Sequence, residues 1–284
     1  MTRYFEAPDG RRLAYQDTGG TGPVVLCLAG LTRNARDFAG LAAHLAEGPN
    51  GRYRVLRLDS RGRGLSDWAD DPIAEYTAPV EAGDALALLD HLEVARAAIV
   101  GTSRGGILGM MIGAMAPGRL SCLVLNDIGP VIEPGGLDYI MGYLGIEPEA
   151  ARFREAAAAL EKSMGPAFPD LSALQWLGFA RTIYRDDGGR PRLSYDARLR
   201  DAVEAALAGA PADLWALFDA LAGLPILTIR GENSDILSAE TLTEMARRRP
   251  DMAHVTVTNR GHAPFLDEPA AVAAIDEFLE RHVA

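Results

Sequence analysis

The first half of the chain alternates between short apolar runs and longer stretches with helical spacing. Apolar runs of this length, without alternation, are typical of strands buried on both faces of a sheet. The predicted strands cover residues 24–28, 54–58, 98–100 and 122–125. The predicted helices between them cover residues 37–46, 79–92 and 107–116. Residues 3–7 and 11–17 flank an Asp-Gly pair and predict a hairpin. This order indicates an α/β fold with a mostly parallel sheet between helices.

The alternation stops at residue 129 and resumes at about residue 224. No buried strand is expected between these positions, and the apolar spacing there is helical. The helices predicted in this segment cover residues 149–164, 172–183, 198–208 and 212–221. The elements predicted after it are strands at 226–229 and 254–258 and helices at 239–249 and 269–282. We therefore predict a core domain of residues 1–128 and 224–284, with a helical cap inserted at residues 129–223.

Composition narrows the class of protein. The chain has 284 residues, 48% of them hydrophobic and 24% charged, as expected of a globular protein. Its formal net charge of -11 argues against nucleic acid or an anionic membrane as partner. The N-terminus has no apolar signal core, and no apolar run approaches the roughly 20 residues of a membrane span. We expect a cytoplasmic protein with no membrane partner. Cys27 and Cys122 lie in strand-like runs and are expected to be buried small hydrophobes.

The central chemical motif lies where a predicted strand runs directly into a predicted helix. The segment Gly101-Thr102-Ser103-Arg104-Gly105 has the pattern G-x-S-x-G. On a sharp strand-to-helix turn, this pattern exposes the serine hydroxyl and leaves no room for side chains two residues away. The pattern alone is a weak signal, but its setting makes Ser103 the candidate nucleophile.

A serine nucleophile needs a base, and His262 is the best placed of the five histidines. It follows the last predicted strand, so it lies at the carboxyl edge of the sheet, as Ser103 does. His44, His91 and His282 lie in or at the ends of amphipathic helices, and His254 opens a strand. We therefore expect His262 to activate Ser103.

Two aspartates can supply the acid that orients the histidine. Asp127 and Asp235 both follow predicted strands at the same sheet edge. Asp235 is preferred because the order Ser, Asp, His, with the acid just before the final helix–strand unit, fits the pattern of serine hydrolases built on such turns. Asp127 is interpreted as a turn or helix cap. Asp59 opens a Gly-rich loop and is expected to fix that turn.

An ester-cleaving serine also needs donors for the oxyanion that develops in the transition state. The backbone N–H of Arg104 begins the helix after Ser103 and supplies one donor. The backbone N–H of Leu31, after Ala29-Gly30, supplies the other.

These motifs together resemble α/β-hydrolase-fold enzymes of the capped esterase, lactonase and C–C hydrolase type. The segments that carry the resemblance are Ala29-Gly30-Leu31, residues 59–66, residues 101–106, Asp235 and Gly261-His262. The resemblance implies a Ser103–His262–Asp235 triad, an acyl-enzyme intermediate and no cofactor or metal. Many relatives carry His-Gly where this chain has Ala29-Gly30, and an uncharged residue at position 104. We expect the Arg104 side chain to pair with a nearby acid such as Asp59; the alternative is that it binds an anionic substrate group.

The expected substrate is a small to medium, largely apolar carboxylic ester or lactone. Hydrolysis of a C–C bond in a vinylogous diketone is an alternative, and cofactor-free perhydrolysis is a weaker one. A non-catalytic ligand receptor on the same fold is the alternative from another class. Ser103 replaces the Asp that epoxide hydrolases and dehalogenases use, which argues against both. The candidate pocket residues are Gly30, Trp68, Tyr143, Trp176 and Trp215. No oligomeric state is predicted.

Overall fold

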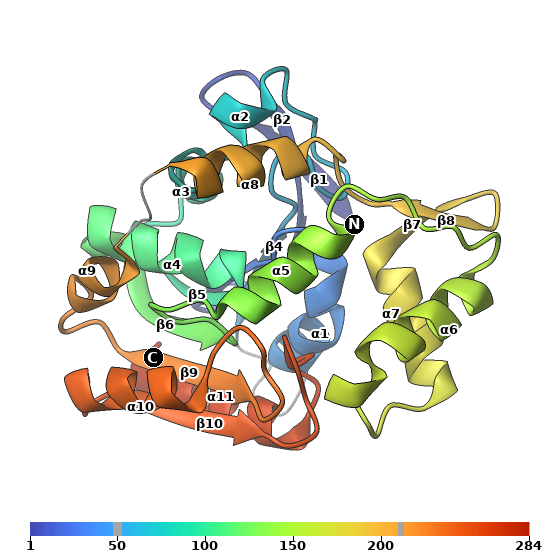
Figure 1. The fold of residues 1–284 in the computed structure, drawn as a ribbon. Helices are drawn as coiled ribbons and strands as arrows, with labels where there is room; N and C mark the ends of the chain where they lie inside the picture. Colours follow the sequence, from blue (N-terminus) through green and yellow to red (C-terminus); the bar gives the residue numbers. More distant parts are fainter. Residues whose placement is uncertain (48–52, 210–212, 284) are drawn as a thin grey trace.

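A central, mostly parallel sheet organises the computed structural model, which describes residues 1–47, 53–209 and 213–283 (Figure 1). Its strands are β1 (Thr2–Glu6), β2 (Arg12–Asp17), β3 (Val24–Leu28), β4 (Arg54–Leu58), β5 (Ala97–Thr102), β6 (Leu120–Asn126), β9 (Ile226–Gly231) and β10 (Ala253–Val257). Their order across the sheet is β1-β2-β4-β3-β5-β6-β9-β10. The predicted hairpin pairs β1 with β2, and β2 runs antiparallel to β4. From β4 to β10 all neighbours are parallel, which confirms the predicted α/β architecture.

Helices cover both faces of this sheet. The helices of the core are α1 (Ala39–Glu47), α3 (Ala78–His91), α4 (Arg104–Met115), α10 (Ala239–Arg248) and α11 (Pro269–His282). The side chains of β3 alternate between the two faces. Leu26 and Leu28 join the cluster that contains α3, α4 and α10, whereas Val25 and Cys27 join the cluster of α1 and α11. Burial on both faces explains why the strands read as continuous apolar runs.

Both cysteines behave as small hydrophobes, as predicted. Cys27 and Cys122 are fully buried and free. Burial raises the pKa of each thiol to about 12, so neither is a thiolate at neutral pH.

Between β6 and β9 the chain forms helices and one small hairpin outside the central sheet. These elements are α5 (Pro134–Tyr143), α6 (Phe153–Met164), α7 (Ala173–Ile183), β7 (Tyr184–Asp187), β8 (Arg190–Leu193), α8 (Leu199–Ala208) and α9 (Leu214–Asp219). Four of the helices were predicted, although Ala212, the predicted start of the last one, lies outside the described residues. Helix α5 and the β7–β8 hairpin were not predicted. Helices α6 and α7 lie side by side beyond the sheet edge, whereas α9 packs on α4 (Figure 1). The domain division at residues 129 and 223 stays a prediction.

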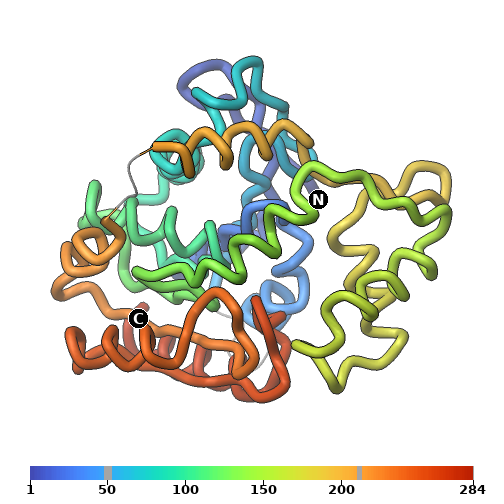
Figure 2. The backbone as a smooth tube through the Cα atoms, viewed as in Figure 1, coloured from blue at the N-terminus to red at the C-terminus, as the bar shows by residue number. Residues whose placement is uncertain are grey.

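The inserted segment is tied to the loop that follows β4. Gly64 donates its N–H to the carbonyl of Ser194, and Asp196 donates to the carbonyl of Gly62, at 2.7 and 2.8 Å. The Tyr76 hydroxyl adds a 2.6 Å hydrogen bond to the Asp196 carboxylate. The inserted segment and the loop after β4, far apart in sequence, therefore lie side by side (Figure 2). Within the described ranges, no helix has both the length and the hydropathy that crossing a membrane requires.

Candidate active site

Ser103 occupies a strained turn between β5 and α4. Its φ of 52° and ψ of -118° are uncommon for a residue with a side chain and mark a sharp turn. The turn brings α4 so close to β3 that a Cβ on Gly105 would overlap the carbonyl oxygens of Leu28 and Ala29. A Cβ on Gly101 would likewise overlap the backbone of Gly105. Both glycines of the motif are therefore required by close backbone packing, as the sequence pattern predicts.

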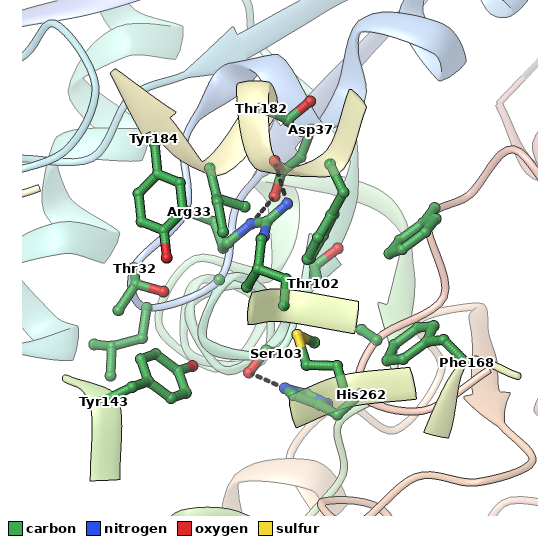
Figure 3. Close-up of a pocket in the computed structure, with 18 of the residues that line it drawn as sticks. Thr32, Arg33, Asp37, Thr102, Ser103, Tyr143, Phe168, Thr182, Tyr184 and His262 are labelled. Carbon is green, nitrogen blue, oxygen red and sulfur yellow. Dashed lines mark hydrogen bonds and ion pairs between the residues drawn. The ribbon is translucent and has the colours of Figure 1, made fainter. Parts of the chain in front are cut away.

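The side chain of His262 reaches Ser103, as expected from their shared sheet edge. Its Nε2 atom lies 2.9 Å from Ser103 Oγ, a contact drawn as a dashed line in Figure 3. The other ring nitrogen, Nδ1, lies 2.8 Å from Oδ2 of Asp127. Ser103, His262 and Asp127 thus form one continuous hydrogen-bonded chain.

The prediction that Asp235 contacts His262 is wrong. Asp127 follows β6, which lies directly beside β5 in the sheet, and its carboxylate is fully buried. That carboxylate also accepts the N–H of Gly231 at 2.7 Å and the hydroxyl of Ser234 at 2.6 Å. The end of β9 and the loop after it therefore supply donors to Asp127 rather than the acid itself. Asp235 is exposed at the wall of the pocket.

Asn126 and Ser234 are site residues that the sequence analysis missed. The Asn126 amide donates to Thr102 Oγ1 at 3.0 Å and to the carbonyl of Pro264 at 2.9 Å. It thereby joins the end of β5 to the loop that carries His262. A polar Asn-Asp pair directly after a buried strand was the available signal in the sequence. Ser234 had no comparable signal.

The two residues predicted to supply oxyanion donors, Leu31 and Arg104, lie beside Ser103 in the fold and in the chain, respectively. The carbonyl of Gly30 accepts the N–H of Arg33 at 3.0 Å, which fixes the peptide that carries the Leu31 N–H. A Cβ on Gly30 would lie 3.6 Å from that of Ser103, so this loop passes close to the nucleophile. Among the described residues, the N–H groups of Leu31 and Arg104 donate to no other protein atom. Both are free to bind an oxyanion, the role predicted for them.

The Arg104 side chain pairs with a buried acid, although a different one from that expected. It donates through Nε and Nη2 to Glu81 at 2.9 and 2.8 Å, and Nη2 also reaches the carbonyl of Tyr76. Asp59, the expected partner, instead accepts the N–H groups of Ala35 and Leu65 at 2.7 and 3.0 Å. Asp59 therefore fixes its own loop, as predicted, and is fully occupied there.

A pocket of about 1000 Å³ opens above Ser103 and His262. One wall is apolar and carries Leu160, Met164, Phe168, Phe179 and Phe265. Polar side chains line another part of the pocket: Tyr143, Thr32, Arg33, Asp37 and Tyr184 (Figure 3). Arg33 holds Asp37 through two hydrogen bonds of 2.7 and 2.8 Å and lies over the Phe179 ring. Burial raises the pKa of the Tyr143 hydroxyl, so Tyr143 is neutral at physiological pH. Gly30 and Tyr143 thus line the pocket, as predicted.

The three tryptophans are not among the described pocket-lining residues, so these predictions are wrong. Trp176 is only 1% exposed because it packs edge-on between Phe168 and Phe179, behind the pocket wall. Trp215 packs against Phe218 and beneath Arg248, and none of these three residues lines the pocket. Trp68 is 52% exposed beside the loop after β4. An aromatic count does not separate residues that support a pocket from those that line it.

We find no candidate binding site for a metal ion in the described part of the chain. No group of three His, Cys, Asp or Glu side chains comes together there in a metal-binding arrangement.

Comparison with known proteins identifies the family of the chain. A model of the alpha/beta hydrolase family matches residues 25–275. The 3-hydroxybutyrate-oligomer hydrolase of Cupriavidus necator is 34% identical over 278 residues, covering 94% of this chain and 92% of that protein. The 2-(acetamidomethylene)succinate hydrolase of Mesorhizobium japonicum is 29% identical and covers 86% of this chain and 82% of that protein.

A solved structure resembles the whole chain. The crystal structure of an alpha/beta hydrolase from Novosphingobium aromaticivorans superposes with a TM-score of 0.92 at 44% identity. The match covers 99% of this chain and 98% of the other. The elbow at Ser103, the fold and these relatives agree, and the chain belongs to the alpha/beta hydrolase family.

Proposed function

We propose that the protein is a carboxylic ester hydrolase that uses Ser103 as its nucleophile. The observation that carries this proposal is the hydrogen-bonded chain Ser103–His262–Asp127 beside two unoccupied backbone donors. A serine hydroxyl becomes a useful nucleophile when a base is in reach and a third group orients that base. Asp127 takes the orienting role that the sequence analysis gave to Asp235.

In the first half-reaction, Ser103 Oγ attacks the ester carbonyl carbon and its proton passes to His262 Nε2. The carbonyl oxygen becomes an oxyanion that accepts the N–H groups of Leu31 and Arg104. When the C–O bond breaks, His262 returns the proton to the leaving alcohol. Asp127 stabilises the imidazolium that forms in between.

In the second half-reaction, water attacks the acyl group on Ser103. His262 takes a proton from the water and returns it to Ser103 Oγ, which releases the carboxylic acid. Each donor of such an oxyanion hole is worth roughly 3 kcal/mol in the transition state.

The pocket supports an ester of small to medium size. Its volume of about 1000 Å³ exceeds what a single short acyl group fills, and its aromatic wall favours an apolar chain. The polar lining residues Arg33, Asp37 and Tyr184 offer donors and acceptors to a polar substituent. The relative that acts on 3-hydroxybutyrate oligomers makes short esters of hydroxy acids the first specific candidates.

A substrate panel tests this proposal. We would measure turnover of p-nitrophenyl acetate, butyrate and octanoate, a medium-ring lactone, 3-hydroxybutyrate trimer and a vinylogous diketone. The proposal predicts ester turnover that falls at least about 1000-fold in His262→Ala. Undiminished ester turnover in that variant would exclude His262 as the base. Cleavage of the diketone without turnover of any ester would replace ester hydrolysis by C–C hydrolysis.

A further inference from the structure

Arg63 is a buried arginine that the reaction described above does not use. It lies in the loop after β4, and its side chain is only 1% exposed. Its Nε atom donates to the carbonyl oxygen of Leu31 at 2.9 Å. Leu31 is the residue whose N–H is proposed above to bind the oxyanion. The Arg63 side chain is therefore hydrogen-bonded to the loop that supplies the Leu31 N–H, one of the two proposed oxyanion donors.

A second hydrogen bond restrains the same loop, in addition to the bond from Arg63 to Leu31. The preceding carbonyl, that of Gly30, accepts the N–H of Arg33 within the turn. One bond thus fixes the peptide that precedes Leu31, and the Arg63 bond fixes the peptide that follows it. With both peptides held, the direction of the Leu31 N–H is determined.

Glu81 links this loop to the other donor. Its Oε1 atom accepts Arg63 Nη1 at 3.1 Å and Arg104 Nη2 at 2.8 Å, and its Oε2 accepts Arg104 Nε at 2.9 Å. Arg104 supplies the second backbone N–H. A single carboxylate from α3 therefore holds Arg104 directly and Leu31 indirectly, through Arg63.

The cluster favours the ionised form of the Glu81 carboxylate. Burial opposes the charged form of Glu81, but the guanidinium groups of Arg104 and Arg63 outweigh it and hold the pKa of Glu81 below its usual range. A buried ion cluster of this kind adds little to stability compared with apolar packing, so its main value lies in fixing geometry.

We propose that Arg63 and Glu81 are positioning residues that set the spacing and direction of the Leu31 and Arg104 N–H groups. This inference rests on the proposed function. An oxyanion hole works because its donors are already aimed at the developing charge, and small displacements reduce the rate without weakening substrate binding.

Arg61 provides a matched control in the same loop. Its side chain is 2% exposed and holds Asp84 through two 2.7 Å hydrogen bonds. It also pairs with Asp9 and Glu75, and it has no contact with Leu31, Glu81 or Arg104 among its hydrogen bonds and ion pairs in the described chain. Replacing Arg61 therefore removes a buried ion cluster without removing a restraint on the donors.

The experiment compares Arg63→Met, Arg63→Lys and Glu81→Gln with Arg61→Met. For each variant we would measure kcat and KM with p-nitrophenyl butyrate, the inhibition constant of an alkyl trifluoromethyl ketone, and the thermal midpoint. The ketone forms an oxyanion on Ser103, so its affinity reports the donors, whereas butyrate as a product inhibitor reports ground-state binding.

We expect Arg63→Met to lower kcat roughly 10- to 100-fold while KM and butyrate inhibition stay within about twofold. Affinity for the trifluoromethyl ketone should fall by the same factor as kcat. Arg63→Lys, which reaches one acceptor at a time, should recover part of both losses. Arg61→Met should lower the thermal midpoint and leave the ratio of ketone to butyrate affinity as in the wild type.

The inference is overturned if the Arg63 variants lower kcat and ketone affinity no more than Arg61→Met does. If Arg63→Met does not fold, the same comparison is made with Arg63→Lys and Glu81→Gln. The inference then fails if their ratio of ketone affinity to butyrate affinity matches that of Arg61→Met. A wild type that neither cleaves esters nor binds the ketone at Ser103 would refute the proposed function itself, and the inference with it.

Discussion

The Nδ1 atom of His262 lies 2.8 Å from Oδ2 of Asp127, a residue that follows β6 and not β9. The acid therefore comes from the strand next to the one that carries Ser103. The last residue of β9 contributes the Gly231 N–H to the same carboxylate, and the loop after β9 contributes the Ser234 hydroxyl. The end of β9 and the loop after it thus fix the buried acid independently of its contact with the histidine.

This relationship predicts very different effects on kcat for two isosteric substitutions, at Asp127 and at Asp235. Asp127→Asn should lower kcat by about 10⁴-fold, because an amide in place of the carboxylate favours the wrong histidine tautomer. Asp235→Asn should change kcat less than about threefold, because Asp235 is exposed at the pocket wall. Steady-state kinetics with p-nitrophenyl butyrate would check both, and a larger loss in Asp235→Asn would contradict the assignment.

The close packing of the elbow predicts that Gly105→Ala is severely destabilising. The new Cβ would overlap two backbone carbonyl oxygens of the β3 end, which cannot move away as a side chain can. We expect a loss of more than about 3 kcal/mol in the free energy of unfolding.

Gly83→Ala is the matched control for the elbow. Gly83 lies inside α3, and a Cβ there would meet nothing within 4 Å, so alanine should stabilise the helix by up to about 1 kcal/mol. Urea unfolding of both variants would measure the contrast. Equal stability of the two variants would contradict the packing argument.

Asp17 is expected to make a pH-dependent contribution to the free energy of unfolding. Burial favours its neutral form, but hydrogen bonds from Arg54 and from the Gly19 N–H lower the pKa of this carboxyl below its usual range. Since the folded pKa lies below the unfolded value of about 3.9, the stabilisation is complete above that pH and is lost as the pH falls below it.

Asp17→Asn should therefore cost about 1–3 kcal/mol at pH 7, and the difference from the wild type should shrink as the pH falls below about 4. Urea midpoints of the two proteins across this range would measure it. A difference that grew towards low pH would show that the sign is wrong.

Substitutions of two neighbouring aromatic residues should have different effects: one at Phe179 should change substrate specificity, and one at Trp176 should lower stability. Phe179 lines the pocket and stacks on Phe265 at 5.0 Å, so Phe179→Ala should enlarge the pocket and shift the preference towards longer acyl chains. Trp176 lies behind it, so Trp176→Ala should cost about 3–5 kcal/mol of stability. An acyl-chain series combined with thermal unfolding distinguishes the two effects. A chain-length shift in the Trp176 variant alone would contradict the assignment of the pocket wall.

The sequence predicted the core of the fold because its strands are short apolar runs buried on both faces. Residues 24–28, 54–58 and 269–282 were located to the residue. Helix α5 was missed because its sequence begins Pro-Gly-Gly and carries another glycine near its end, which weakens the helical pattern. Its position depends on packing over the pocket rather than on local propensity.

Ser103 and His262 were found because the parallel topology places both at one sheet edge. The acid was misassigned because topology allows Asp127 and Asp235 equally, and only the three-dimensional path of the loop after β9 separates them. The pairing of Arg104 with Glu81 was likewise beyond the sequence. It joins residues 23 positions apart on two helices whose relative placement is set by the whole core.

Fluorophosphonate labelling followed by peptide mass spectrometry tests the central claim most directly. We predict stoichiometric labelling of the wild type on Ser103, abolished in Ser103→Ala and slowed strongly in Asp127→Asn. Labelling of another residue, or no labelling of the folded wild type, would contradict the claim that Ser103 is an activated nucleophile.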